Sequence, residues 1–150
     1  MDNYMKLEIA AKGENESFAR SAVAAFALPL SPSLSELADI KTAVSEAVTN
    51  SVVHAYVNGE TDRKIVIECR ICRGELHIEI TDYGCGIEDV EKAQTPFFTT
   101  LSGEERSGMG FTIMQTFMDG FSLQSAKGKG TRVAMVKRIG AGETKERVDA

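Results

Sequence analysis

The chain has 150 residues, 43% of them hydrophobic, which is close to the commonest size of a single domain. Its formal net charge of -5 argues against a broad surface for DNA or RNA, which would need clustered Lys and Arg side chains. No run approaches the roughly 18 to 20 apolar residues that cross a bilayer, and Asp2 stands where a signal peptide would be basic. We therefore expect one cytoplasmic domain over residues 1–150, without direct contact to nucleic acid or membrane.

The three cysteines do not favour a metal or redox site. Cys69 and Cys72 lie in a strand-like stretch, and residues three apart on a strand point to opposite faces. The chain offers no second close pair to complete a zinc site. Reduced, structural cysteines are the better interpretation.

The first part of the chain predicts a strand followed by a helix. Leu7 and Ile9 alternate with polar neighbours, which is typical of a strand. Asn15 can cap a helix that Pro29 and Pro32 would end. The apolar face of this helix is expected to contain Phe18, Ala22, Ala25 and Phe26.

A long helix and a hairpin follow. Ser33–Glu36 reads as a capping box, which opens a helix running to about Tyr56. Two alternating segments, Lys64–Cys72 and Glu75–Asp82, predict strands joined by a tight turn at Arg73-Gly74.

The remainder predicts a long loop, a helix and two strands. Residues 83–110 are rich in Gly, Ser and Thr, and a loop of that length usually works as a lid or binding element. Helical spacing over Phe111–Asp119 precedes strands near Phe121–Ser125 and Thr131–Lys137, and residues 139–150 read as a flexible polar tail. This order of elements predicts an α+β fold, a two-layer sandwich with helices on one face of a mixed, mostly antiparallel sheet.

A polar stripe follows one side of the long helix. Thr42, Glu46, Asn50 and His54 recur every four residues. A solvated helix face is the ordinary explanation of such a stripe. Glu46 and Asn50 also suit magnesium-nucleotide chemistry, because an amide oxygen can bind the ion while a carboxylate takes a proton from the attacking hydroxyl.

Asp82 continues the inward phase of its strand, after Leu76, Ile78 and Ile80. A buried carboxylate needs a donor, which a backbone N–H, an Arg or a ligand such as the amine of adenine would supply. The glycines of Gly84-Cys85-Gly86 would let the backbone approach a flat base.

Two further glycine turns follow. Ser107–Gly110 leads directly into a helix, where free N–H groups could bind phosphate, although ordinary helix entries also read this way. Gly128–Thr131 adds a turn with a hydroxyl, which is equally compatible with a plain hairpin.

The motifs together resemble those of the GHKL superfamily of ATPases and kinases, in the order of its N box and glycine boxes. They are Glu46–Asn50, Asp82–Gly86, Gly108–Gly110 and Gly130-Thr131. The match continues through Asn15–Arg20, Pro96–Thr100 and Glu105–Met114. Over nearly the whole chain the sequence is similar to the family of sporulation anti-sigma F factors, which are serine kinases of spore-forming bacteria.

The resemblance implies a Bergerat-type ATP-binding fold and a role for each matching residue. Glu46 would be the general base, Asn50 would hold Mg²⁺, and Asp82 would read adenine. Arg106, in an ATP lid, would offset charge on the transferred phosphoryl group. ATP or ADP would further contact Gly84, Gly86, Thr99, Thr100, Ser107, Gly108, Met109, Gly110 and Thr131.

The resemblance also implies partners: a homodimer, a sporulation sigma factor that the protein sequesters, and an anti-anti-sigma factor that it phosphorylates on serine. Arg20 would lie on the dimer or sigma-binding surface, or be a solvated helix residue.

Three other functions would use a similar nucleotide-binding domain. An ATPase clamp of the gyrase type would need a further domain. A complete sensor histidine kinase would need a helical hairpin with an acceptor histidine. A nucleotide-gated module that binds a sigma factor without chemistry would not require Glu46.

Overall fold

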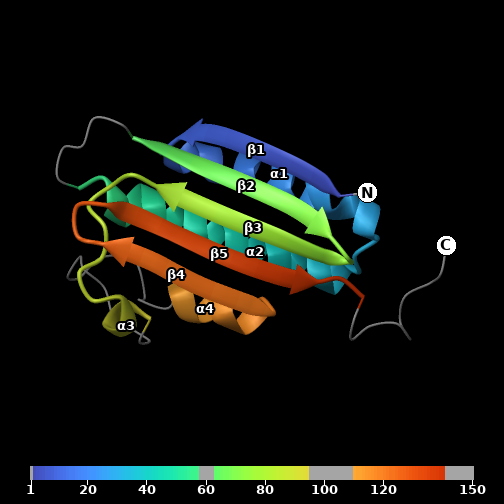
Figure 1. Cartoon of the computed structure of the whole chain (residues 1–150). Helices are drawn as coiled ribbons and strands as arrows, with labels where there is room; N and C mark the ends of the chain where they lie inside the picture. The colour runs from blue at the N-terminus through green and yellow to red at the C-terminus, as the bar shows by residue number, and fades with distance from the viewer. Residues whose placement is uncertain (1, 58–62, 95–109, 141–150) are drawn as a thin grey trace.

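The computed structural model describes residues 2–57, 63–94 and 110–140, and the fold below is that of these residues (Figure 1). The strands are β1 Asn3–Ala10, β2 Lys64–Cys72, β3 Glu75–Asp82, β4 Gly120–Ala126 and β5 Gly130–Arg138. The α-helices are α1 Glu16–Ala27, α2 Leu34–Asn50, α3 Val90–Ala93 and α4 Gly110–Phe117. Two 3₁₀ turns, η1 Gly13–Asn15 and η2 Leu28–Leu30, and a π-helix, η3 Ser51–Ala55, complete them.

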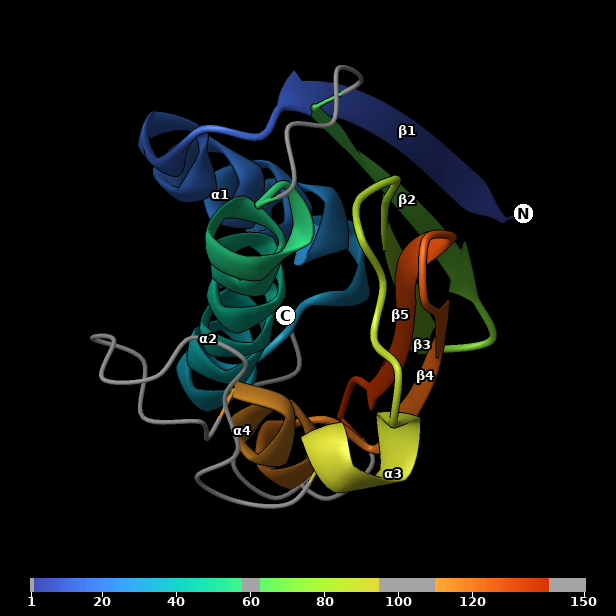
Figure 2. The same ribbon diagram turned by 90° about the vertical axis from the view of Figure 1, so that its left-hand side faces the viewer.

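The five strands form one sheet in the order β1-β2-β3-β5-β4. Every neighbouring pair in it is antiparallel, so the parallel pairing that a mixed sheet would contain does not occur among these strands. Figure 2 shows the two layers, with α1 and α2 on one side of the twisted sheet. The predicted α+β sandwich is therefore confirmed.

The core lies between the sheet and the helices. Alternate residues of β2 and β3 point inward and are fully buried, among them Ile65, Ile67, Leu76 and Ile78. They pack with the buried side of α2 in one hydrophobic cluster. Each such side chain stabilises the fold by roughly 1.5–3 kcal/mol on burial. Burial of these alternating side chains is therefore the main interaction that fixes the strands.

The capping box of α2 and the tight turn of the hairpin are both confirmed. The Ser33 hydroxyl accepts a hydrogen bond from the Glu36 N–H at 3.0 Å, and the Glu36 carboxylate accepts from the Ser33 N–H at 2.9 Å. Arg73 and Gly74 both have positive φ, 53° and 77°, which closes the tight turn between β2 and β3.

The predicted buried face of α1 is wrong except at Phe26, which is partly buried and packs against the core. Phe18 is 53% exposed, and the buried residues of α1 are Ala19, Val23, Ala24 and Ala27. Small side chains let α1 approach α2 closely, whereas the prediction gave weight to the aromatic rings. Asn15 stands at the N-cap position of α1, but its side chain makes no capping hydrogen bond. Its amide donates instead to the Ala10 carbonyl at 2.9 Å.

The long helix continues to Ala55, close to the predicted end at about Tyr56, but its last turn is not α-helical. The α-helical part stops at Asn50, and Ser51–Ala55 continue as the π-helix η3. Of the predicted tail, Ile139 and Gly140 are described. The Gly140 N–H donates to the Glu36 carboxylate at 2.7 Å, and the remaining tail residues lie outside the described ranges.

Candidate functional site

The predicted polar residues gather where α2 ends, β3 finishes and β5 begins. Glu46 and Asn50 are one turn apart on α2 and both are half-buried. Gly110, the first residue of α4, lies so close to Asn50 that a methyl group at its Cα would come within 2.8 Å of the Asn50 amide nitrogen. The fold therefore places the Asn50 amide against the start of α4.

Asp82 is buried, with 4% of its surface exposed. One carboxylate oxygen accepts the N–H groups of Gly84, at 3.1 Å, and Thr131, at 3.2 Å. The other oxygen accepts the Ser51 hydroxyl at 3.0 Å. The donors that the inward position required thus come from three separate segments, and together they fix the direction of the carboxylate.

The glycine turn after Asp82 packs directly on η3. The Cys85 N–H donates to the Ala55 carbonyl at 2.7 Å, and the Cys85 thiol to the His54 carbonyl at 3.3 Å. A methyl group on Gly84 would lie 2.1 Å from the Ala55 carbonyl oxygen, so only glycine fits there. The sequence predicted a close approach by a ligand at these glycines, and for Gly84 the close neighbour is the protein backbone.

A hydroxyl pair ties the last glycine turn to this loop. The Ser125 and Thr131 hydroxyl oxygens are 2.8 Å apart, and Ser125 also accepts the Ile87 N–H at 2.8 Å. Thr131, predicted from Gly130-Thr131, therefore lies beside Asp82 both through its backbone N–H and along the strand pairing of β3 with β5.

Two residues of the group were not predicted. Ser51 holds Asp82, and its place on the apolar side of the long helix was a usable signal, because a polar residue in that phase needs a buried partner. The Tyr56 hydroxyl donates to the Lys64 carbonyl at 2.5 Å and accepts the Tyr83 N–H at 2.8 Å. It braces the residue after Asp82, and no sequence pattern indicated it.

Other predicted residues are not part of this group. Arg20 lies on α1, where its guanidinium, 41% exposed, pairs with Glu16 at 2.9 Å. Glu16 also accepts the hydroxyl of Ser45, which joins α1 to the turn of α2 that carries Glu46. Six predicted residues lie outside the described ranges: Thr99, Thr100, Arg106, Ser107, Gly108 and Met109.

The group offers a fixed acceptor, the Asp82 carboxylate, of the kind that an amine-bearing ring needs, rather than a cage of metal ligands. Among the described residues no three His, Cys, Asp or Glu side chains cluster to hold a metal. Mg²⁺, however, needs only one or two protein ligands when phosphates complete its shell, and the Asn50 amide with the nearby Glu46 fits that requirement.

The cysteines are free in the described structure. Cys69 is buried on β2, and burial raises the pKa of its thiol to about 12.

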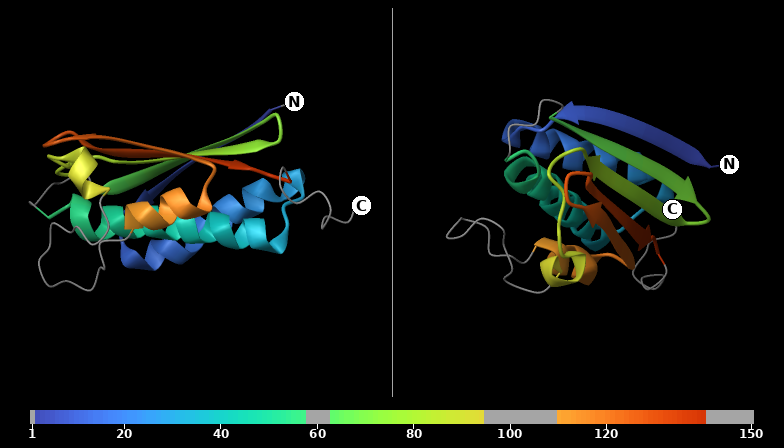
Figure 3. Two further views of the ribbon diagram at one scale, coloured as in Figure 1. Left: turned by 90° about the horizontal axis from the view of Figure 1, so that it is seen from below. Right: turned by 60° about the vertical axis from the view of Figure 1, so that its left-hand side comes forward.

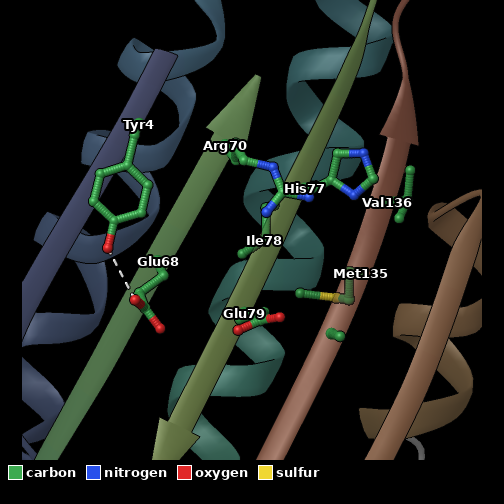
Figure 4. A pocket seen from close by; sticks show the side chains of 9 residues that line it. Tyr4, Glu68, Arg70, His77, Ile78, Glu79, Met135 and Val136 are labelled. Carbon is green, nitrogen blue, oxygen red and sulfur yellow. Dashed lines mark hydrogen bonds between the residues drawn. The ribbon is translucent and has the colours of Figure 1, made fainter. Parts of the chain in front are cut away.

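The opposite face of the sheet carries a hollow with different residues. Figure 4 shows Tyr4, Glu68, Arg70, His77 and Glu79 around it, with the Tyr4 hydroxyl donating to Glu68 at 2.9 Å. None of the predicted site residues lines this hollow.

Comparison with known proteins gives one consistent result. The model of the histidine kinase-like ATPase domain family matches residues 9–137. The anti-sigma F factor of Clostridium botulinum (strain Eklund 17B / Type B) is 57% identical over 92% of this chain and 96% of the relative. That of Caldanaerobacter subterraneus subsp. tengcongensis is 56% identical over 93% of this chain and 96% of its own length.

Two solved structures share the fold at low identity. The RsbU and RsbW domains of Rv1364c from Mycobacterium tuberculosis superpose with a TM-score of 0.65 at 16% identity. The match covers 91% of this chain and only 32% of that one. The histidine kinase domain of the Erythrobacter litoralis EL346 blue-light activated kinase gives a TM-score of 0.55 at 17% identity, over 91% of this chain and 64% of that one. In the described residues, no helix has the length and apolar character that a membrane span requires.

Proposed function

The chain belongs to the histidine kinase-like ATPase family and, within it, to the anti-sigma F factors, and from this premise we propose that it is an ATP-dependent serine kinase that also binds a sigma factor. The observation that carries the proposal is the buried Asp82, held by three donors beside the end of α2 that bears Glu46 and Asn50.

In this proposal Asp82 reads adenine. Its carboxylate cannot turn freely, because Gly84, Thr131 and Ser51 all donate to it. A fixed acceptor at the end of β3 is suited to the exocyclic amine of adenine, and a fixed acceptor loses little freedom when the base binds. Gly86 and Thr131 would shape the same pocket.

Asn50 would hold the magnesium ion, which when bound neutralises charge on the phosphates. Glu46, one turn earlier on the same side of α2, would accept the proton of the incoming serine hydroxyl. The serine oxygen would then bond to the terminal phosphorus of ATP as the bond to ADP breaks. The contribution of the protein is mainly to position these groups. Gly110 contacts Asn50 and would bring the start of α4 near the phosphates.

The resemblance supplies the remaining parts of the proposal. Arg106 would offset charge during transfer, and Thr99, Thr100, Ser107, Gly108 and Met109 would contact the nucleotide. Arg20 would lie on a partner-binding surface. The proposed partners are a second copy of the chain, a sporulation sigma factor, which the names of the relatives support, and an anti-anti-sigma factor as substrate. We place this activity in one cytoplasmic domain.

The test is phosphate transfer from labelled ATP to the matching anti-anti-sigma protein by the wild type, Glu46→Ala and Glu91→Ala. Glu91 is an exposed carboxylate of α3 and serves as the control. The proposal expects loss of transfer with retained ATP binding in Glu46→Ala alone. If the wild type binds ATP and the sigma factor but transfers nothing, the chain is a nucleotide-gated binding module instead.

A further inference from the structure

Lys137 occupies an unusual position on β5. The inward residues of this strand are Val133 and Met135, both buried, and Lys137 continues the same phase opposite the fully buried Leu76. Its side chain is only 12% exposed. An ammonium group in such a place is costly unless it is paired and hydrogen-bonded.

Lys137 has two partners, on two different helices. Its ammonium donates to the Asp39 carboxylate on α2 at 2.9 Å and to the Phe117 carbonyl, the last residue of α4, at 2.7 Å. A cation at the carboxyl end of a helix also interacts favourably with the helix dipole. Lys137 therefore joins β5, α2 and the end of α4 at a single point.

The other end of α4 meets the candidate site. Gly110 lies against Asn50, near the carboxyl end of α2, while Phe117 is tied through Lys137 to Asp39, near its amino end. Helix α4 therefore runs antiparallel to α2 and alongside it, as Figure 3 shows. With eight residues and a length of about 12 Å, α4 is a short rigid rod held at both ends.

Much of the hydrophobic packing around α4 can adapt. The buried side chain of α4 is Met114, Met118 follows directly after the helix, and methionine is flexible and adapts to several packings, while Phe111 at the start of α4 packs against Phe121. The Lys137 contacts are directional, because one ammonium must satisfy a carboxylate and a carbonyl at once. They restrict both the slide and the rotation of α4 along α2.

We infer that Lys137 is a positioning residue for the nucleotide, which sets the place of Gly110 relative to Asn50 by anchoring the far end of α4. This inference rests on the proposed nucleotide site. It adds a residue that determines nucleotide affinity from the end of α4 remote from that site. Loosening the anchor lowers nucleotide affinity without touching any group that contacts the nucleotide.

The experiment measures the dissociation constant of a fluorescent ADP analogue for the full chain, together with the thermal unfolding midpoint without nucleotide. The variants are Lys137→Met, Asp39→Asn, the double variant and the conservative Lys137→Arg. Arg138→Met is the matched control, because it removes the same charge from the next residue of β5, whose side chain pairs with Glu75 on the opposite face.

We expect Lys137→Met to weaken ADP binding about tenfold, within the range usual for coupling between separate sites. Asp39→Asn weakens ADP binding less, and the double variant weakens it no more than Lys137→Met alone. Lys137→Arg keeps most of the wild-type affinity, and Arg138→Met leaves the affinity unchanged.

An unfolding midpoint lowered in Lys137→Met or Asp39→Asn with an unchanged ADP dissociation constant overturns the inference and leaves Lys137 a purely structural residue. If Lys137→Met does not fold, Asp39→Asn decides the question, since it keeps the size of the side chain and removes only its charge. A wild type that fails to bind the analogue refutes the proposed function rather than the role of the anchor.

Discussion

Replacing Asp82 tests the central feature of the site without any nucleotide. In Asp82→Ala the Ser51 hydroxyl and the N–H groups of Gly84 and Thr131 all lose their acceptor. An unsatisfied buried donor costs about 1–3 kcal/mol, and the N–H of Thr131 is only partly buried, so water can reach it. The two buried donors, Ser51 and Gly84, sum to about 2–6 kcal/mol, a large share of the roughly 5–15 kcal/mol of a typical domain.

Asp82→Asn should behave differently. The amide oxygen can still accept from both backbone N–H groups, and the amide N–H₂ can donate to Ser51, whose hydroxyl accepts as well as donates. The variant loses only the charge, so we expect a cost of about 1–2 kcal/mol. The amide now presents a donor where the carboxylate presented an acceptor, so nucleotide affinity should fall in both variants.

The assay is urea unfolding of the wild type and both variants, with equal slopes as the sign of a two-state comparison. Free energies of unfolding for Asp82→Ala and Asp82→Asn that agree within about 0.5 kcal/mol would contradict the reasoning, because they would mean that the three donors do not depend on the carboxylate.

Three further predictions follow from local contacts. Ser33→Ala removes half of the capping box and should lower the free energy of unfolding by about 1 kcal/mol in urea titrations; a loss below 0.3 kcal/mol would argue against the cap. Gly84→Ala should abolish ADP-analogue binding and lower the unfolding midpoint, because its methyl group would meet a carbonyl oxygen at 2.1 Å, while Gly13→Ala, with nothing within 4 Å, should change neither. Since burial raises the Cys69 thiol pKa to about 12, its thiolate should stay scarce from pH 7 to 10; mass spectrometry should find alkylation of Cys72 far ahead of Cys69 in the native protein, and equal rates would refute the burial.

The hairpin of β2 and β3 was predicted to the residue because three independent signals agree there. β3 alternates strictly, β2 alternates except at the buried Val66, and the turn at Arg73-Gly74 leaves no other register. Burial in such a hairpin is decided by the parity of each position, which the sequence states directly.

The helices were harder to predict because their burial depends on what they pack against. On α1 the buried stripe consists of Ala19, Val23 and Ala27, whose small side chains give little hydrophobic signal, while the larger Phe18 faces outward. The site was predictable where a polar residue stood in an apolar phase, as at Asp82. Ser51 and Lys137 also stand in an apolar phase, and each has a buried or largely buried polar partner.

The π-helix at the end of α2 links the helix to a distant part of the chain. The carbonyls of His54 and Ala55 accept from Cys85, thirty-one and thirty residues further on, so a tertiary contact takes the place of the local glycine cap with which many helices end. Helix end and glycine loop should therefore open as one cooperative unit. In hydrogen exchange, the amides of Ser51–Ala55 and of Cys85 would lose protection together, at a rate separate from that of the strands behind them.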